Sequence, residues 1–138
     1  MRFNHITLLV TELERSKAFY RMLGLVQIVD TPPRYARFQF PDGDATLSLE
    51  VTGDALGVPA SAQLFFECDA LDEQVAALKS TGLEFEQEPT DMFYLWREAR
   101  LRDPDGYDIR LYYAGENRLN PPWKIKEAEP GASATPQA

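Results

Sequence analysis

The sequence predicts an α+β fold in which one small βαβββ module occurs twice in tandem. Residues 3–25 and residues 62–83 both read as a strand followed by a helix and a glycine stop. Three further strand-like segments follow the helix in each copy. A shift of 58 residues superimposes equivalent points of the two copies: His5 on Gln63, Leu13 on Leu71, and Gly24 on Gly82.

The first copy begins with an alternating segment, residues 3–10, which is typical of a strand. Thr11 is the predicted helix N-cap, and Glu14 stands at the capping-box spacing. The helix is expected to end at Gly24, because glycine readily adopts the left-handed conformation of a helix stop. The remaining strands are predicted over residues 25–30, 35–40 and 45–51, with a hairpin turn at residues 41–44.

The second copy begins with a predicted strand over residues 62–68, and Asp69 is the expected cap of the helix that follows. Leu71, Val75 and Leu78 repeat at helical spacing, and Gly82 ends this helix. The later strands are predicted over residues 83–87, 93–103 and 107–113, with turns at residues 89–91 and 104–106.

These elements divide the chain into four parts. Residues 1–52 form the first module, residues 53–61 a linker, and residues 62–113 the second module. Residues 114–138 form a tail that is irregular, and disordered from about residue 127, because it is rich in alanine, proline, glycine and serine.

Composition disfavours several classes of function. The 138 residues are 44% hydrophobic and 26% charged, which is typical of a globular protein. A net charge of −8 disfavours nucleic-acid and membrane-surface binding, and no window is apolar enough to span a membrane. The single cysteine, Cys68, cannot form an internal disulfide, so a reducing, cytoplasmic location is expected.

Alternation along the strands predicts which side chains share the sheet face turned away from the helices. Polar groups in the middle of apolar strands are costly unless they are paired, so their recurrence on this face indicates a site. From the first strand of each copy these side chains are His5, Thr7 and Leu9, and Gln63, Phe65 and Glu67; from the last strand they are Ser48 and Glu50, and Arg110 and Tyr112.

A divalent metal is one explanation of this pattern. Imidazole nitrogen with carboxylate and amide oxygen is a suitable ligand set, which makes His5, Glu50 and Gln63 the candidate ligands. The alternative is that His5 is a structural histidine whose ring is satisfied by hydrogen bonds.

The βαβββ repeat, the opening His5, the LERSKAFYRMLGL helix and the DPDGYDIRLY turn and strand together resemble the vicinal oxygen chelate superfamily. This superfamily contains glyoxalases, bleomycin resistance proteins and extradiol dioxygenases. The resemblance implies that the two modules form a curled mixed β-sheet cup. It also implies one divalent metal (Zn, Ni, Mn or Fe), held by His5, by Gln63 and by Glu50 rather than Ser48.

One position departs from the resemblance. Arg110 stands where the superfamily commonly has a carboxylate, and a guanidinium offers no lone pair to a metal. Arg110 could face a substrate carboxylate, or pair with Glu50 or Glu67 in a metal-free pocket. In a third reading the strand is shifted by one residue and Arg110 faces solvent.

The leading hypothesis is a metal-dependent lyase or isomerase that acts on a small oxygenated molecule. A metal-free binding protein of the bleomycin-resistance type is the alternative, and an extradiol-type dioxygenase is disfavoured because the chain has one histidine. A homodimer is expected from exposed module edges. The candidate catalytic residues are Glu50 and Glu67, and the candidate substrate-binding residues are Phe65, Trp96, Arg110 and Tyr112.

Overall fold

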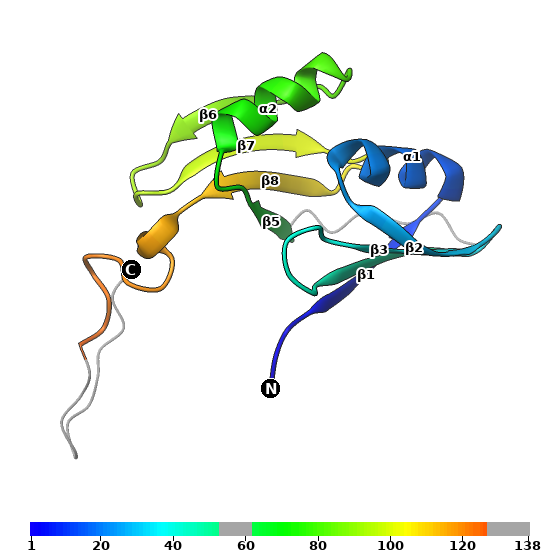
Figure 1. The fold of residues 1–138 in the computed structure, drawn as a ribbon, viewed down its shortest axis with the longest axis horizontal. Helices are drawn as coiled ribbons and strands as arrows, with labels where there is room; N and C mark the ends of the chain where they lie inside the picture. The colour runs from blue at the N-terminus through cyan, green and yellow to red at the C-terminus, as the bar shows by residue number, and fades with distance from the viewer. Residues whose placement is uncertain (53–61, 127–138) are drawn as a thin grey trace.

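A computed structural model describes residues 1–52 and 62–126 of the chain (Figure 1). The predicted linker, residues 53–61, and the segment predicted to be disordered from residue 127 lie outside the described residues. No helix in the described part of the chain is long and apolar enough to cross a membrane.

The two modules have the same order of elements. The first contains β1 (His5–Val10), α1 (Leu13–Leu23), β2 (Val26–Thr31), β3 (Tyr35–Gln39) and β4 (Thr46–Val51). The second contains β5 (Gln63–Glu67), α2 (Leu71–Ser80), β6 (Gln87–Asp91), β7 (Arg97–Arg102) and β8 (Asp108–Tyr113), followed by a short 3-10 helix, η1 (Gly115–Asn117).

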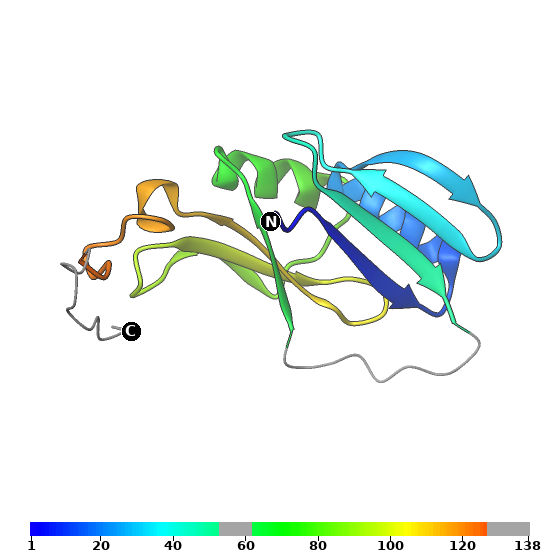
Figure 2. The same cartoon turned by 90° about the horizontal axis from the view of Figure 1, so that it is seen from below.

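Each module forms one mixed four-stranded sheet, in the order β1-β4-β3-β2 or β5-β8-β7-β6. The first and last strands of each module are parallel, and the other pairs are antiparallel. Both helices lie on the same side of the sheets (Figure 1). The α+β fold with two tandem modules is therefore confirmed. The two sheets remain separate, with β1 and β5 as the edges that lie toward one another (Figure 2).

The core lies between each sheet and its helix. In the first module Leu8, Val10, Leu47 and Leu49 turn toward α1, where Tyr20 is fully buried. In the second module the buried side chains of Ala99, Leu101, Ile109 and Leu111 turn toward Leu71, Val75 and Leu78 of α2. The alternate residues of these strands therefore form the open face of each sheet, the face turned away from the helix.

Three predicted boundaries in the second module are wrong, including that of the strand predicted over residues 93–103, which begins only at Arg97. The strand predicted over residues 83–87 begins only at Gln87, and the predicted turn at residues 89–91 lies inside it. Pro89 is tolerated there because β6 is the last strand of its sheet and need not donate a hydrogen bond outward. The turn instead lies after β6, where the amide of Leu95 donates to the carbonyl of Met92 at 3.0 Å.

The predicted helix caps are also wrong. Neither helix has a side-chain N-cap bond, so Thr11 and Asp69 do not cap α1 and α2. The Thr11 hydroxyl instead donates to Asp105 of the second module at 2.7 Å. Asp105 also accepts from the Ser16 hydroxyl at 3.2 Å and pairs with Arg15 at 3.4 Å. A carboxylate from the other module thus lies at the positive end of the α1 dipole.

Asp103, in the same turn as Asp105, makes a second contact between the modules. Its carboxylate accepts from the backbone amides of Asp105 and Tyr107, both at 2.9 Å, and from the buried Tyr20 hydroxyl of α1 at 2.7 Å. Burial raises the pKa of Asp103 and holds the pKa of Tyr20 well above its usual value. The Tyr107 hydroxyl donates to the carbonyl of Leu9 at 2.9 Å. We call residues 103–107 the docking turn.

Asp105→Ala is expected to lower the free energy of unfolding by about 1–3 kcal/mol, because it leaves the Thr11 and Ser16 hydroxyls without their acceptor. Asp42→Ala is the matched control. Asp42 occupies the corresponding place in the Pro41-Asp42-Gly43 turn of the first module. Its carboxylate makes no hydrogen bond within the described residues. Urea denaturation measures both variants; equal losses would contradict a special role for the docking turn.

Candidate functional site

A cavity of about 870 Å³ lies where the two modules meet, between the edge strands β1 and β5. Its size falls in the range of small-molecule sites. Apolar side chains form most of its wall, and both strands contribute polar groups. The residues that line it include His5, Phe40, Asp42, Gln63, Phe65, Glu67 and Cys68. We call this cavity the junction cavity.

The structure brings His5 and Gln63 to the same cavity, in agreement with their equivalent places in the repeat. Both imidazole nitrogens of His5 already have partners. Nδ1 lies 2.6 Å from the hydroxyl of Thr46, and Nε2 lies 3.1 Å from the hydroxyl of Thr7. His5 is therefore a histidine with two threonine partners at the rim of the cavity.

Glu50 lies away from this pair. In the parallel β1–β4 ladder His5 stands opposite Thr46, whereas Glu50 stands opposite Leu9. Four residues of strand correspond to about 13 Å. Metal bonds to nitrogen and oxygen are roughly 2 Å long, so His5 and Glu50 do not share one ion in this arrangement. Ser48 is buried, and its hydroxyl lies 2.5 Å from the Tyr35 hydroxyl.

Glu67 lines the junction cavity, and one carboxylate oxygen accepts a hydrogen bond from the amide of Ala114 at 3.1 Å. This bond ties the end of β5 to the chain after β8. The other oxygen has no hydrogen-bond partner within residues 1–52 and 62–126. Of the two candidate catalytic carboxylates, Glu67 reaches the cavity and Glu50 does not.

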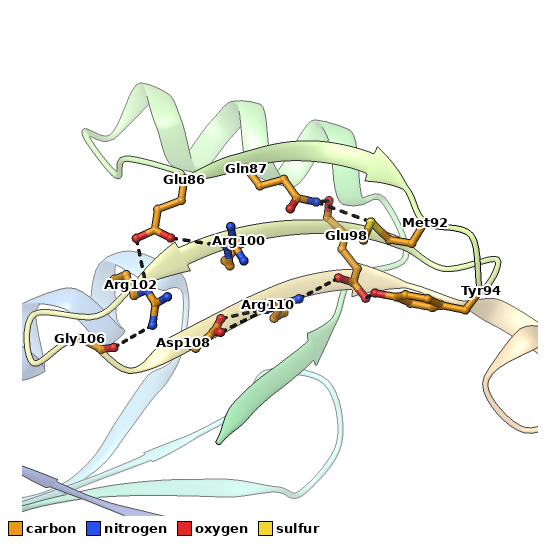
Figure 3. Close-up of polar contacts among 10 residues, drawn as sticks. All are labelled: Glu86, Gln87, Met92, Tyr94, Glu98, Arg100, Arg102, Gly106, Asp108 and Arg110. Carbon is orange, nitrogen blue, oxygen red and sulfur yellow. Dashed lines mark hydrogen bonds and ion pairs between the residues drawn. The ribbon is translucent and has the colours of Figure 1, made fainter. Parts of the chain in front are cut away.

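Arg110 lies on the open face of the second sheet, where Figure 3 shows it within a network of acidic and basic side chains. It contacts Asp108 through Nε at 3.1 Å and Nη2 at 3.2 Å, and Glu98 through Nη1 at 3.3 Å. The hydrogen bonds to Asp108 raise the pKa of Arg110, and those from Arg110 lower the pKa of Asp108. Arg110 thus pairs with neither Glu50 nor Glu67, and it does not face bulk solvent.

Glu98 and Asp108 are the residues that reasoning from the sequence missed. Glu98 is fully buried and also accepts a hydrogen bond from the Tyr94 hydroxyl. Burial, followed by this bond, raises the pKa of Tyr94 to about 12. The signal was present, because Glu98 alternates with Arg100 and Arg102 along one strand of otherwise apolar neighbours.

The candidate substrate-binding residues do come together. Trp96 and Tyr112 stack with ring centroids 4.9 Å apart, and Phe65 meets both rings edge-on at 5.7 and 5.4 Å. The guanidinium of Arg110 lies over the Phe65 ring, 5.8 Å from its centroid. Phe65 also lines the junction cavity, so it joins the cavity to the open face of the second sheet.

The fit to a divalent metal is poor. Within the described residues no three His, Cys, Asp or Glu side chains are grouped so that they could hold an ion. His5 and Gln63 supply one imidazole and one amide, and the threonine contacts of His5 compete for its lone pair. This donor set is neutral and weak for a divalent cation.

Comparison with known proteins gives a consistent picture. Residues 2–111 match the model of the glyoxalase/bleomycin resistance protein/dioxygenase superfamily. A trivalent organoarsenical cleaving enzyme from Bacillus sp. (strain MD1) is 29% identical over 136 residues, covering 88% of this chain and 81% of that enzyme.

Solved structures share the fold at lower identity. A superfamily member from Sphaerobacter thermophilus aligns with a TM-score of 0.68 at 21% identity, over 82% of this chain and 97% of that one. A lactoylglutathione lyase from Agrobacterium tumefaciens aligns with a TM-score of 0.65 at 19% identity, over 86% and 96%.

Cys68 is expected to be an unreactive thiol. Burial, followed by the nearby carboxylate of Asp42, raises its pKa to about 11. A raised pKa lowers the thiolate fraction at any pH below it, so alkylation by iodoacetamide at pH 8 should be on the order of a hundredfold slower than for a free thiol. The rate should rise roughly tenfold per pH unit toward pH 11. Mass spectrometry measures it, with urea-unfolded protein as the control; equal rates would contradict the burial of Cys68.

Proposed function

This chain belongs to the glyoxalase/bleomycin resistance protein/dioxygenase superfamily, and we propose that it binds a small organic molecule without a metal held by His5, Glu50 and Gln63. The proposed ligand occupies the junction cavity and the adjoining open face of the second sheet. Phe65, Trp96, Arg110 and Tyr112 are the proposed contact residues.

The observation that carries the proposal is the pairing of Arg110. A fixed positive charge stands at the position where the resemblance implied a metal-binding carboxylate, and two carboxylates neutralise it. A cation placed nearby would meet this guanidinium and would have to draw Asp108 or Glu98 away from it. A neutral or anionic organic molecule meets no such opposition.

The walls of the site support the same proposal. The aromatic rings of Phe65, Trp96 and Tyr112 provide flat apolar surface, and a cavity of about 870 Å³ accommodates a molecule of drug size. Binding by aromatic surface with a few polar groups needs no proton transfer and no bound ion. The bleomycin-resistance side of the superfamily is therefore the closer functional model for this chain.

A metal-dependent lyase or isomerase is the second candidate function. It is favoured by His5 and Gln63, which line the same cavity, and by the named activities of two similar proteins, one a cleaving enzyme and the other a lyase. A bound divalent metal would stabilise an oxyanion in such a reaction. Glu67 is then the proposed proton carrier, because its carboxylate reaches the cavity.

The edge strands also support a proposed homodimer. Within residues 1–52 and 62–126, β1 and β5 each have one edge without a strand partner, and such edges invite pairing with a second chain. The single cysteine supports the further proposal of a cytoplasmic protein.

Elemental analysis of protein purified without chelator separates the two candidates. The binding proposal expects far less than one metal ion per chain and a melting temperature that EDTA does not change. The fluorescent probe 8-anilinonaphthalene-1-sulfonate should bind the junction cavity equally well with and without EDTA. One tightly bound ion per chain that is lost in His5→Ala, with Thr90→Ala at an exposed position of β6 as the control, would overturn the proposal in favour of the lyase.

A further inference from the structure

The guanidinium of Arg100 has unused hydrogen-bonding capacity on the open face of the second sheet (Figure 3). Its Nε atom is buried and has no hydrogen-bond partner among the described residues. Its one ion pair there joins Nε to Glu86 at 3.5 Å, which is long for a charged pair. The two terminal nitrogens make no hydrogen bond within the same residues. Leaving the buried Nε donor unsatisfied is costly. The terminal nitrogens are not among the buried atoms, so a ligand can reach them.

The neighbouring arginines compete with Arg100 for carboxylate partners and add to the positive charge around it. Arg100 stands directly opposite Arg110 in the β7–β8 ladder, and like charges in that position repel. Arg110 takes Asp108 and Glu98 as partners. Arg102 bonds Glu86 at 3.2 Å, so the carboxylate that pairs with Arg100 among the described residues is shared. An anion beside Arg100 would reduce the repulsion that the described carboxylates leave uncompensated.

The aromatic surface lies in the same row of the sheet. Phe65 stands opposite Arg110 on one side, and Arg100 stands opposite Arg110 on the other. Two strand spacings separate Phe65 from Arg100, about 10 Å between their backbones. A molecule with one or two fused rings and one carboxylate spans that distance.

We propose that the open face of the second sheet binds an aromatic carboxylate, whose carboxylate is held by Arg100 and whose ring lies on Phe65 and Trp96. This inference rests on the proposed binding function and names its ligand class. The two terminal nitrogens of Arg100 form a planar fork that matches both oxygens of a carboxylate. The chain carries a net charge of −8, so Arg100, whose charge is only partly neutralised by the shared Glu86, is a local exception that attracts anions.

The test compares 2-naphthoate with its uncharged analogue 2-naphthamide, by calorimetry on the full chain. Wild type is expected to bind naphthoate at least tenfold more tightly than naphthamide. Arg100→Gln should lose about tenfold or more in affinity for naphthoate and leave naphthamide unchanged. Arg34→Gln, a change at an exposed arginine of the first module, is the matched control and should alter neither affinity.

Glu86→Gln is expected to change naphthoate affinity in the opposite direction. It removes the carboxylate that Arg100 and Arg102 share, so naphthoate affinity should rise severalfold while naphthamide affinity stays constant. A structural role for Arg100 would not produce this gain. Circular dichroism and melting temperature establish that each variant is folded.

Equal affinities of wild type for the two probes would overturn the anion site and leave the proposed binding function standing. A loss of both probes in Arg100→Gln, with the fold intact, would equally overturn it. If neither probe binds, the inference fails. The proposed function is then decided separately, by elemental analysis and by binding of 8-anilinonaphthalene-1-sulfonate to the junction cavity.

Discussion

The arrangement of the two modules depends on the docking turn, because its carboxylates bond the start and the middle of α1. Asp105 meets Thr11 and Ser16, and Asp103 meets the buried hydroxyl of Tyr20. Among the described residues the equivalent turn of the first module makes no such contact: Asp42 lines the junction cavity instead. One turn of the repeat is therefore docked on the opposite helix, and its copy borders an open space. The junction cavity lies where the duplicated contact is missing, at a departure from the repeat.

The architecture could be predicted from local patterns. Gly24 and Gly82 adopt positive φ angles just beyond the two helices, as their spacing indicated. Alternation placed His5, Gln63, Phe65 and Arg110 on the open faces. The boundaries of β6 could not be predicted, because Pro89 and Thr90 read as a turn unless the strand is known to be an edge. Whether it is an edge depends on the order of strands in the sheet, which local sequence does not encode.

The site was less accessible to sequence reasoning, because it depends on position along a strand as well as on face. His5 and Glu50 share a face, yet the β1–β4 ladder places Glu50 beside Leu9. That register follows from the lengths of the intervening helix and hairpins. The partners of Arg110 were missed because Glu50 and Glu67 were the only partners expected for it. The actual partners lie within one sheet: Asp108 belongs to the same strand as Arg110, and Glu98 belongs to the adjacent strand.

The chemistry of the open face follows from the balance of charge along β7 and β8. Arg100, Arg102 and Arg110 face Glu86, Glu98 and Asp108, so the row is neutral as a whole. The charges are not balanced pair by pair, however. Arg110 pairs with two carboxylates, and one of them, Glu98, is fully buried and bonded to Tyr94. The remaining carboxylate serves two guanidinium groups. The carboxylates of this face, which could bind a cation, are already paired with arginines. Arg100 still has N–H groups that could donate to an anion. The anion selectivity that we propose for this face therefore depends on Arg100, the arginine left without a full partner among the described residues.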